Sequence, residues 1–241
     1  MPAEKIAQNK VAIITGGGSG IGLAIARVFA TNGYSVVITG RDAKRLQSAS
    51  ATISSDEKKV TCIPCDVRDP ASVEKLFREV SKDHSAIDVL VNNAGVAHSL
   101  APVDQLTIET WRDAIDTNLT GTFLITRAAL PLMSPGGTIV NNLSVAALQP
   151  FAGMAAYNAS KFGALGFTQA LREDLRKRGI RVLALLPGAT DTEIWSQFWP
   201  DAPKEKMISA ETVAQAVLHA LSVPANTAIE EIRIGPAAGV L

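Results

Sequence analysis

Hydrophobic and polar residues follow two patterns that alternate along the whole chain. Short runs rich in β-branched residues predict strands, and between them apolar residues recur every three or four positions, which predicts amphipathic helices. The predicted strands are residues 11–15, 35–39, 60–64, 89–92, 138–142, 181–186 and 231–234. The predicted helices lie near residues 21–32, 42–54, 71–83, 109–133, 155–178 and 210–222.

Several predicted strands are apolar throughout, for example residues 11–14 (Val-Ala-Ile-Ile) and 182–186 (Val-Leu-Ala-Leu-Leu). Such runs are typical of a parallel sheet that is covered on both faces. Seven strands with six crossovers therefore predict an α/β fold, a Rossmann-type doubly wound sheet of seven parallel strands flanked by helices on both faces. Because such sheets bind ligands at the carboxyl ends of their strands, the motifs that follow strands are candidate site residues.

Length and composition limit the class of protein. The 241 residues are enough for one α/β domain, so residues 1–241 are expected to form a single domain. Hydrophobic residues make up 47% and charged residues 19% of the chain, as in ordinary globular proteins. The 23 basic and 23 acidic residues leave no net charge to attract nucleic acid or an anionic membrane, so small molecules and copies of the chain itself are the expected partners.

The first residues of the chain are not expected to form a signal peptide. Residues 1–10 are polar and lack the apolar core of a signal peptide. No later apolar run reaches the ~18 residues needed to cross a bilayer. We therefore expect a cytoplasmic protein.

The cysteines and histidines do not form a metal-binding pattern. Cys62 and Cys65 form a C-x-x-C, as in redox pairs and half zinc sites, but Pro64 separates them and no second pair follows. We therefore interpret them as part of a buried strand. The three histidines are far apart in the sequence, and no metal site is predicted. His98 is expected either to contact a substrate or, as we favour, to lie on a loop surface.

A glycine-rich segment, residues 15–22 (Thr-Gly-Gly-Gly-Ser-Gly-Ile-Gly), lies between the first predicted strand and the first predicted helix. Glycines let backbone N–H groups approach a pyrophosphate closely, and a helix N-terminus adds aligned donors and partial positive charge. Five glycines in seven residues exceed what a turn requires, so the segment predicts a dinucleotide site. We expect Gly20 and Gly22 to lie against the phosphates and Gly16 to make the turn. The cofactor-binding residues expected here are Gly16, Gly18, Ser19, Gly20, Ile21 and Gly22.

The residues after the second predicted strand bear on the choice of cofactor. An acidic residue there binds a free ribose 2′-hydroxyl, whereas an arginine binds a 2′-phosphate. This chain has Gly40 where the acid is expected and Arg41 next to it, whose guanidinium can hold a phosphate through two parallel hydrogen bonds. We therefore favour NADP(H) over NAD(H), with a solvated loop arginine as the alternative. Asp66, after the third strand, is expected to accept from the adenine amino group or to cap the helix that opens at Pro70.

Tyr157 and Lys161 are four positions apart in a predicted helix, so they share one helix face. Ser144 lies thirteen residues before Tyr157. Because a cation beside a phenol favours the phenolate, we expect the pKa of Tyr157 to lie below its ordinary value of about 10. The pair then predicts proton transfer near neutral pH, and a solvated surface pair is the alternative.

Taken together, these motifs resemble the short-chain dehydrogenase/reductase family in its compact form, and the resemblance covers nearly the whole chain. Residues 15–22 match the glycine motif of the family, residues 92–95 match its N-N-A-G, and residues 186–192 (Leu-Pro-Gly-Ala-Thr-Asp-Thr) match its nicotinamide-contacting turn. The catalytic residues implied by the resemblance are Asn118, Ser144, Tyr157 and Lys161. Two departures are Leu143, where the family often has a serine, and Ser19, where one NADP-using subset has a basic residue.

The resemblance implies an NAD(P)-dependent oxidoreductase that transfers hydride between the nicotinamide and an apolar ketone, aldehyde, 3-oxoacyl compound or secondary alcohol. Tyr157 would give or take the proton, and Lys161 would tune its pKa and bind the ribose. Ser144 would stabilise the substrate oxygen, and Asn118 would anchor a water that resupplies the proton. Outside the glycine segment, the implied cofactor-binding residues are Arg41, Asp66, Val67, Asn93, Ala94, Gly95, Tyr157, Lys161, Pro187, Gly188, Thr190 and Thr192.

The substrate is expected to meet a mostly apolar wall. The long loop of about residues 188–209 carries several aromatic side chains, which form a substrate lid or, alternatively, pack as core or as an oligomer contact. The expected substrate-binding residues are Ser144, Val145, Met154, Tyr157 and Trp195. Relatives in the family pair through their long helices, which implies a homo-oligomer, a dimer or a tetramer.

Two other classes of protein share parts of this pattern. One is a non-catalytic NADP(H)-binding sensor or regulatory protein, against which the complete set of catalytic residues argues. The other is a dehydratase or epimerase that keeps its nucleotide bound, and it needs a larger substrate domain than 241 residues allow.

Overall fold

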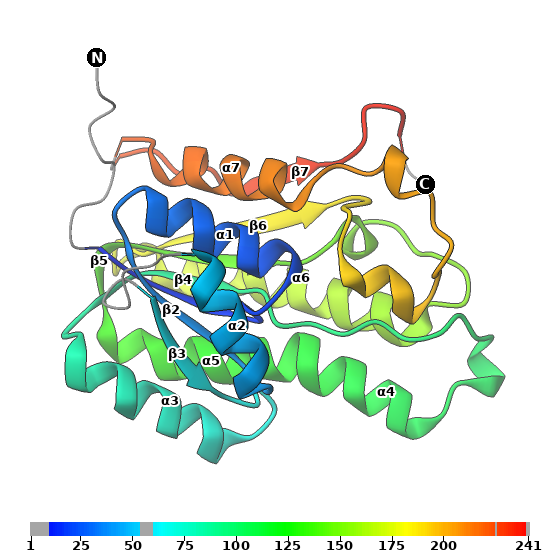
Figure 1. Cartoon of the computed structure of the whole chain (residues 1–241), viewed down its shortest axis with the longest axis horizontal. Helices are drawn as coiled ribbons and strands as arrows, with labels where there is room; N and C mark the ends of the chain where they lie inside the picture. The colour runs from blue at the N-terminus through cyan, green and yellow to red at the C-terminus, as the bar shows by residue number, and fades with distance from the viewer. Residues whose placement is uncertain (1–9, 54–59, 225, 240–241) are drawn as a thin grey trace.

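A parallel sheet of seven strands forms the centre of the computed structural model, which describes residues 10–53, 60–224 and 226–239 (Figure 1). The strands are β1 (Val11–Thr15), β2 (Ser35–Gly40), β3 (Val60–Pro64), β4 (Ile87–Asn92), β5 (Met133–Asn142), β6 (Arg181–Pro187) and β7 (Glu231–Ile234). Their order in the sheet is β3-β2-β1-β4-β5-β6-β7, and all neighbouring strands are parallel. The predicted Rossmann-type fold is confirmed, with the order reversing between β1 and β4, where such sheets bind ligands.

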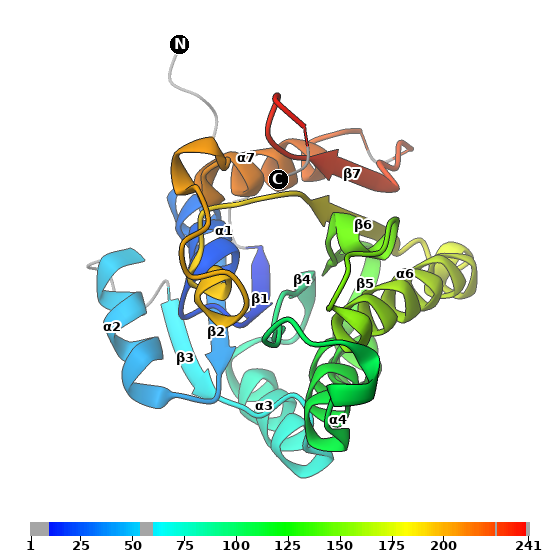
Figure 2. The ribbon, with the colours of Figure 1, turned by 90° about the vertical axis from the view of Figure 1, so that its right-hand side faces the viewer.

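Helices cover both faces of the sheet. The helices are α1 (Gly20–Thr31), α2 (Ala43–Ile53), α3 (Pro70–Asp83), α4 (Ile108–Ile115), α5 (Gly121–Ala129), α6 (Ala155–Arg176) and α7 (Ala210–Leu221). Helices α1 and α7 pack side by side on one face, whereas α3, α5 and α6 lie on the other, so the molecule has three layers (Figure 2). None of the helices in the described part of the chain is long and apolar enough to cross a membrane.

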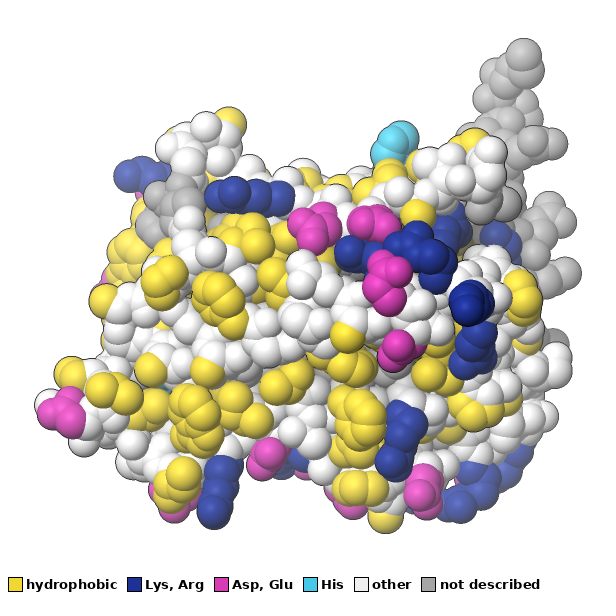
Figure 3. Space-filling view, turned by 180° about the vertical axis from the view of Figure 1, so that it is seen from behind, with side chains coloured by type: hydrophobic (Ala, Val, Ile, Leu, Met, Phe, Trp, Pro, Cys, Tyr) yellow, Lys and Arg dark blue, Asp and Glu magenta, His cyan; other side chains and the backbone are white. Residues whose placement is uncertain are grey.

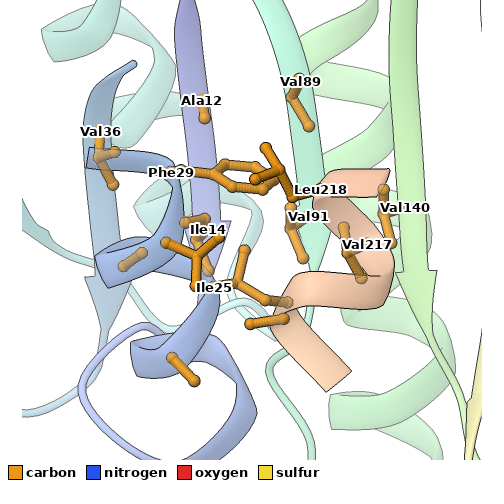
Figure 4. Packing of buried hydrophobic residues seen from close by; sticks show 14 of the residues in the cluster. Ala12, Ile14, Ile25, Phe29, Val36, Val89, Val91, Val140, Val217 and Leu218 are labelled. Carbon is orange, nitrogen blue, oxygen red and sulfur yellow. The ribbon is translucent and has the colours of Figure 1, made fainter. Parts of the chain in front are cut away.

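Alternate residues of each strand supply the two halves of the core. Ala12 and Ile14 of β1 pack with residues of α1 and α7, whereas Ile13 between them packs with residues of α3 and α5. Phe29 of α1 is fully buried, and Figure 4 shows its ring between β1 and α7. Burial of one such ring contributes about 1.5–3 kcal/mol.

The main error in the predicted secondary structure is the single helix over residues 109–133. The structure divides it into α4, a π-helical turn (Asp116–Thr120), α5 and a 3-10 turn (Leu130–Leu132). Pro131 in that last turn lacks the N–H that would continue the helical hydrogen bonds. A π-helical turn adds only one residue per turn, which the spacing of apolar residues does not reveal.

The fifth strand also begins earlier than predicted, at Met133 rather than at residue 138. The pairing of Ile87 with Met133 is separated by an irregularity from the regular pairing that begins at Val89 and Thr138. Gly136 lies in this irregular part with a φ of 89°, a conformation that glycine adopts readily. The other boundaries agree with the prediction to within two residues.

Candidate active site

A cavity of about 770 Å³ lies at the carboxyl ends of the strands, on the side of the molecule that Figure 2 shows from the front. Residues that follow each of the strands β1 to β6 line it, so motifs far apart in the sequence meet here. The predicted site residues in the lining are Gly16, Gly18, Ser19, Gly20, Ile21, Arg41, Asp66, Val67, Asn93, Ala94, Gly95, Ser144, Val145, Met154, Tyr157, Lys161, Pro187, Gly188, Thr190, Thr192 and Trp195. Two predicted site residues, Gly22 and Asn118, lie outside it.

The N-terminus of α1 meets this cavity without a side-chain cap. Ser19 stands at the N-cap position, and its hydroxyl makes no capping hydrogen bond. By contrast, Asp69 caps α3 and Ser209 caps α7 by accepting from N–H groups of the first turn. An uncapped helix N-terminus between Gly18 and Gly20 suits an anionic group such as a pyrophosphate.

Gly22 is not among the residues that line the cavity, and its predicted place beside the phosphates stays a prediction. A Cβ there would overlap the Gly16 carbonyl oxygen and the Asn93 amide, so the position has no room for a side chain. Gly22 is therefore required for close packing of α1 on the turn. The spacing of glycines in the sequence is the same for this role as for a phosphate contact, so it cannot distinguish the two. Gly16 has a φ of 65°, as suits the turn predicted for it.

Charged side chains gather at the end of the cavity formed after β2 and β3. Arg41 lines this end and is exposed. Both carboxylate oxygens of Asp66 accept hydrogen bonds from the Arg68 guanidinium, which lowers the pKa of Asp66. The alternative that Asp66 caps α3 is wrong, because Asp69 accepts from two N–H groups of the first turn instead.

Arg45 is a cavity residue that the sequence did not single out. It lies on α2 beside Gly18 and forms an ion pair with Glu193, which belongs to a 3-10 turn (Glu193–Gln197) in the long loop. An exposed arginine in a polar helix gives no signal by itself, because only the fold brings α2 beside the glycine segment. Arg41 and Arg45 therefore add two guanidinium groups to that of Arg68, which is paired with Asp66, at this end of the cavity.

Ser144 and Tyr157 meet in the cavity, and their hydrogen bond affects the phenol. Ser144 Oγ accepts from the Ala146 N–H at 3.1 Å, so its own hydroxyl proton is available to another acceptor. Burial raises the pKa of Tyr157, and the hydrogen bond with Ser144 opposes the rise. The predicted lowering of this pKa is therefore wrong here, because loss of water around the phenolate outweighs its neighbours, and the phenol keeps its proton at neutral pH.

Lys161 lies one turn of α6 after Tyr157, and its side chain is buried. Its Nζ donates to the Asn142 carbonyl oxygen at 3.2 Å and lies 5.6 Å from the centre of the Tyr157 ring. Burial lowers the pKa of Lys161 to about 8. An ammonium has three donors, so the contact with Asn142 leaves capacity for ligand hydroxyls.

Asn118 lies in the π-helical turn, buried behind the cavity lining. Its Nδ2 donates to the Val96 carbonyl oxygen at 3.0 Å and to Ser160 Oγ at 2.9 Å, while its Oδ1 accepts from the Val96 N–H at 2.8 Å. Ser160 Oγ in turn donates to the Tyr157 carbonyl oxygen at 2.7 Å. The Asn118 side chain therefore holds the segment after β4 and the start of α6 together.

Asn93 and Asn142 connect the glycine segment to Lys161. Asn142 Nδ2 donates to Asn93 Oδ1 at 2.7 Å, and Asn93 Nδ2 donates to the carbonyl oxygens of Thr15 and Gly16 at 2.9 and 3.2 Å. The carbonyl oxygen of Asn142 then accepts from Lys161. Asn142 was not predicted as a site residue, because in the sequence it is only the last residue of a strand.

His98 is not the loop-surface residue that the sequence favoured. Its side chain is buried, and it lies outside the cavity lining, so a contact with substrate is not supported either. Its ring makes hydrogen bonds with the Ser99 carbonyl oxygen and with the Tyr157 N–H. A single histidine in a loop carries no sign of such a partner in the sequence.

The wall of the cavity beyond Ser144 is mostly apolar. The Trp195 ring N–H donates to the Thr190 carbonyl oxygen at 2.8 Å, and the ring packs against Phe198 with centroids 4.9 Å apart. The loop of residues 188–209 thus packs its own aromatic side chains together and places them in the lining. The large apolar lining residues are Val96, Leu100, Val145, Phe151, Met154, Trp195, Phe198 and Trp199.

Metal-ligating side chains are not grouped in the part of the chain that the structure describes. No three His, Cys, Asp or Glu side chains there lie close enough together to hold a metal ion. Cys62 lies in β3 and Cys65 follows it, and both thiols are free. Burial raises the pKa of the Cys65 thiol, which keeps it in its neutral form.

Comparison with known proteins gives one family. The profile of a family described as short chain dehydrogenase matches residues 10–203. The matched range contains every predicted site residue, and only the part of the chain with α7 and β7 lies beyond it.

Individual relatives are similar over nearly the whole chain. An uncharacterized oxidoreductase of Staphylococcus aureus strain MW2 is 32% identical over 230 residues, which cover 95% of this chain and 97% of the relative. Among solved structures, the closed form of a serine dehydrogenase complexed with NADP+ has a TM-score of 0.87 and 31% identity, covering 96% of each chain. An alcohol dehydrogenase from the archaeon Thermococcus sibiricus, complexed with 5-hydroxy-NADP, has a TM-score of 0.88 and 27% identity, covering 96% of this chain and 98% of that one.

Proposed function

The chain belongs to the short-chain dehydrogenase family, and from that premise we propose that this oxidoreductase uses NADPH to reduce the carbonyl group of an apolar ketone, aldehyde or 3-oxoacyl compound. In the reverse direction it oxidises the corresponding secondary alcohol. The observation that carries the proposal is the meeting of Ser144, Tyr157 and Lys161 with the uncapped N-terminus of α1 in one cavity. One end of that cavity suits a dinucleotide and the other suits an apolar substrate.

Three side chains around the substrate oxygen have different roles in proton transfer. The nicotinamide cofactor supplies the hydride when bound. Tyr157 donates its phenolic proton to the substrate oxygen, a role that suits a phenol whose pKa is raised by burial. Ser144 donates a hydrogen bond to the same oxygen, because its Oγ already accepts from a backbone N–H. Lys161 holds its ammonium near the Tyr157 ring and stabilises the phenolate that forms.

Proton resupply involves the residues behind Lys161. In this proposal Asn118 would hold a water that resupplies the proton to Tyr157, and Lys161, beside Tyr157, would also hold the ribose of the bound cofactor. Gly95 lies beside both groups, because a Cβ there would stand 3.2 Å from Asn118 Oδ1 and 3.7 Å from Lys161 Nζ. A side chain at residue 95 would therefore crowd the two polar groups.

The cofactor preference rests on the charged end of the cavity. Arg41 and Arg45 bring two guanidinium groups there, and a guanidinium binds a phosphate through charge-assisted hydrogen bonds. Gly40 stands where an acidic residue would bind a free 2′-hydroxyl. These features support NADP(H) over NAD(H).

Substitution of the two arginines tests this preference. Arg41→Ala is expected to raise the dissociation constant of NADPH about 10- to 30-fold and that of NADH less than about threefold, because only NADPH carries the phosphate. Arg45→Ala is expected to raise the dissociation constant of NADPH by a smaller factor, because Arg45 is already paired with Glu193. Fluorescence titration gives both constants, and Arg78→Ala on the exposed side of α3 serves as the control. Equal losses for the two cofactors would show that these arginines do not hold a phosphate.

The lining of the other end supports an uncharged, apolar substrate. Trp195, Met154 and Val145 form part of this wall, with residues 188–209 as the proposed substrate loop. The cationic lining residues other than Lys161 are Arg41, Arg45 and Arg68, all at the end after β2 and β3. Apart from Lys161, then, no arginine or lysine among the described lining residues stands at the substrate end to pair with a substrate carboxylate.

The direct test follows the absorbance of NADPH and of NADH in the presence of a panel of carbonyl compounds. The panel contains apolar ketones, aldehydes and 3-oxoacyl esters, with 2-oxo acids as charged controls. We expect NADPH to be consumed with apolar members, faster than NADH, and little consumption with the 2-oxo acids. Tight NADPH binding with no turnover on any member would favour the alternative, a non-catalytic sensor or regulatory protein.

We also propose that the chain forms a homo-oligomer through its long helices. Trp111 of α4, Phe123 of α5 and Phe162 of α6 are exposed by 38%, 42% and 44%. Figure 3 shows hydrophobic side chains at several places on the face seen from behind. Burial of exposed aromatic rings between copies would remove apolar surface from water. Sedimentation equilibrium distinguishes monomer, dimer and tetramer.

A further inference from the structure

The first turn of α6, which carries Tyr157, has no capping side chain of its own. Met154 occupies the N-cap position and makes no side-chain capping hydrogen bond. The Asn158 N–H donates to the Met154 carbonyl oxygen, so the helical N–H groups before it need acceptors from outside the helix. Tyr157 is the third helical residue, a position whose N–H a capping side chain commonly serves.

His98 supplies this acceptor from the segment after β4. Its Nε2 lies 3.3 Å from the Tyr157 backbone nitrogen, and its Nδ1 lies 2.8 Å from the Ser99 carbonyl oxygen. A backbone N–H only donates and a carbonyl oxygen only accepts. Both contacts are therefore hydrogen bonds only if the imidazole is neutral and carries its proton on Nδ1.

We propose that His98, in the Nδ1-protonated form, is a positioning residue that caps the first turn of α6 and thereby fixes the place of the Tyr157 phenol. This inference rests on the proposed function of Tyr157 as proton donor. Because His98 lies outside the cavity lining, it acts through the Tyr157 backbone and not through a contact with substrate. His98 as a residue is only 8% exposed, so packing holds the ring in place.

The carbonyl group of Tyr157 is anchored as well as its N–H group. Ser160 Oγ donates to the Tyr157 carbonyl oxygen and accepts from Asn118 Nδ2. Asn118 is in turn bonded to Val96, two residues before His98. Both anchors of Tyr157 therefore lead to the same segment, residues 96–99.

That segment is also fixed to the proposed substrate loop. The Ala97 N–H donates to Gln197 Oε1 at 3.0 Å, and Ser99 Oγ donates to the Gln197 carbonyl oxygen at 3.3 Å. His98 lies between these two contacts. The residue that caps α6 therefore lies in a segment that is held from both sides. Such support suits a residue that keeps a reacting group in place. A misplacement of a reacting group by about 1 Å can lower a rate about 100-fold.

Two substitutions separate the capping bond from the other contact of the ring. His98→Gln keeps an acceptor near the position of Nε2, whereas His98→Asn keeps a donor near Nδ1 but is too short to reach the Tyr157 N–H. We expect His98→Asn to lower kcat about 10- to 30-fold, with KM and the NADPH dissociation constant within about twofold of wild type. His98→Gln is expected to keep kcat within about threefold of wild type.

The pattern across the two variants decides the proposal. A wild-type kcat in His98→Asn would overturn it. Equal losses of kcat in both variants would also overturn it, because they would indicate that only the volume of the ring matters. A rise in KM with kcat unchanged would overturn it too, because it would indicate a role in substrate binding. Circular dichroism and NADPH titration of each variant confirm that it is folded.

The protonation form of the ring is tested without catalysis, on the wild-type protein. The chain has three histidines, so the ring ¹⁵N signals of His98 are identified by their loss in His98→Gln. We expect a protonated Nδ1 and an unprotonated Nε2 at neutral pH. A proton on Nε2 would overturn the proposal. This test does not depend on whether His98→Asn folds. If the wild type consumes no NADPH with any carbonyl compound, the proposed function fails, while this measurement still decides whether His98 caps α6.

Discussion

The core beneath α1 and α7 and the crevice at the ends of β4 and β5 both contain buried side chains, but of opposite kinds. In the core, Phe29 is fully buried, and the centroid of its ring lies 4.8 Å from that of the Tyr34 ring. In the crevice, Lys161 and Asn118 are exposed by only 6% and 3%. Burial of apolar surface in the core stabilises the fold. Burial of an ammonium and of amide groups in the crevice opposes folding unless each group is hydrogen-bonded.

Because of this difference, we expect substitutions in the core to affect mainly stability and substitutions in the crevice to affect mainly activity. The pKa of Lys161, lowered to about 8, reflects the desolvation of its ammonium in the crevice. Substitutions in the core should therefore change the free energy of unfolding and leave the activity of each folded molecule unchanged. Substitutions in the crevice should change activity and can even stabilise the fold.

The largest stability effect is expected in the core. Phe29→Ala removes a fully buried ring and is expected to lower the free energy of unfolding by about 3–5 kcal/mol. Urea unfolding measures this loss, and kcat at low temperature, where the variant remains folded, is expected to equal that of wild type. A tenfold loss of kcat in the folded variant would show that core and crevice are not separable.

Lys161→Met is expected to have the opposite effect on stability. The pKa of Lys161 falls from 10.5 to about 8 on folding, and at ~1.4 kcal/mol per pKa unit the variant should gain about 3 kcal/mol at pH 7 while losing carbonyl reduction. Lys177→Met, exposed at the end of α6, is the control and should change stability by less than about 0.5 kcal/mol.

The gain from Lys161→Met should depend on pH in a defined direction. Below pH 8 the lysine is charged in both folded and unfolded chains, so the full desolvation penalty applies to wild type. Between pH 8 and 10.5 the folded protein loses this proton before the unfolded chain does, so the wild type recovers stability as pH rises. Urea unfolding at pH 7 and pH 10 should show the difference between the two proteins shrink, and a constant difference would exclude desolvation as its cause.

A smaller effect is expected in the glycine segment, which touches both regions. Gly22→Ala places a Cβ against the Gly16 carbonyl group and should destabilise the protein by about 1–3 kcal/mol. Gly18→Ala is the matched control, since its Cβ would lie 3.4 Å from the flexible Arg45 side chain, and it should cost less than about 1 kcal/mol. Thermal unfolding of the two variants measures both, and equal losses would contradict the packing role assigned to Gly22.

The sequence predicts the fold because each apolar run is bounded by polar or turn-forming residues. Strands β1, β3 and β7 begin and end where they were predicted. The π-helical turn Asp116–Thr120 escaped prediction, because one added residue leaves the apolar pattern almost unchanged.

The candidate site was predicted as far as it consists of motifs next to strands. Arg45 was missed and the place of His98 was predicted wrongly because their partners are remote in sequence. Tyr157 is 59 positions from His98, and Glu193 is 148 positions from Arg45. The direction of the Tyr157 pKa shift was wrong for a related reason. Spacing places Lys161 near the phenol, but only the folded structure shows how strongly both groups are desolvated.

The central claim, that Tyr157 protonates a carbonyl oxygen in the crevice, is tested most directly by a single-turnover measurement. Enzyme saturated with NADPH is mixed with an active carbonyl compound, and the decay of NADPH absorbance is followed for wild type and for Tyr157→Phe. The account predicts a decay at least about 1,000-fold slower in Tyr157→Phe, with the NADPH dissociation constant within about twofold of wild type. A decay within tenfold of wild type would contradict it.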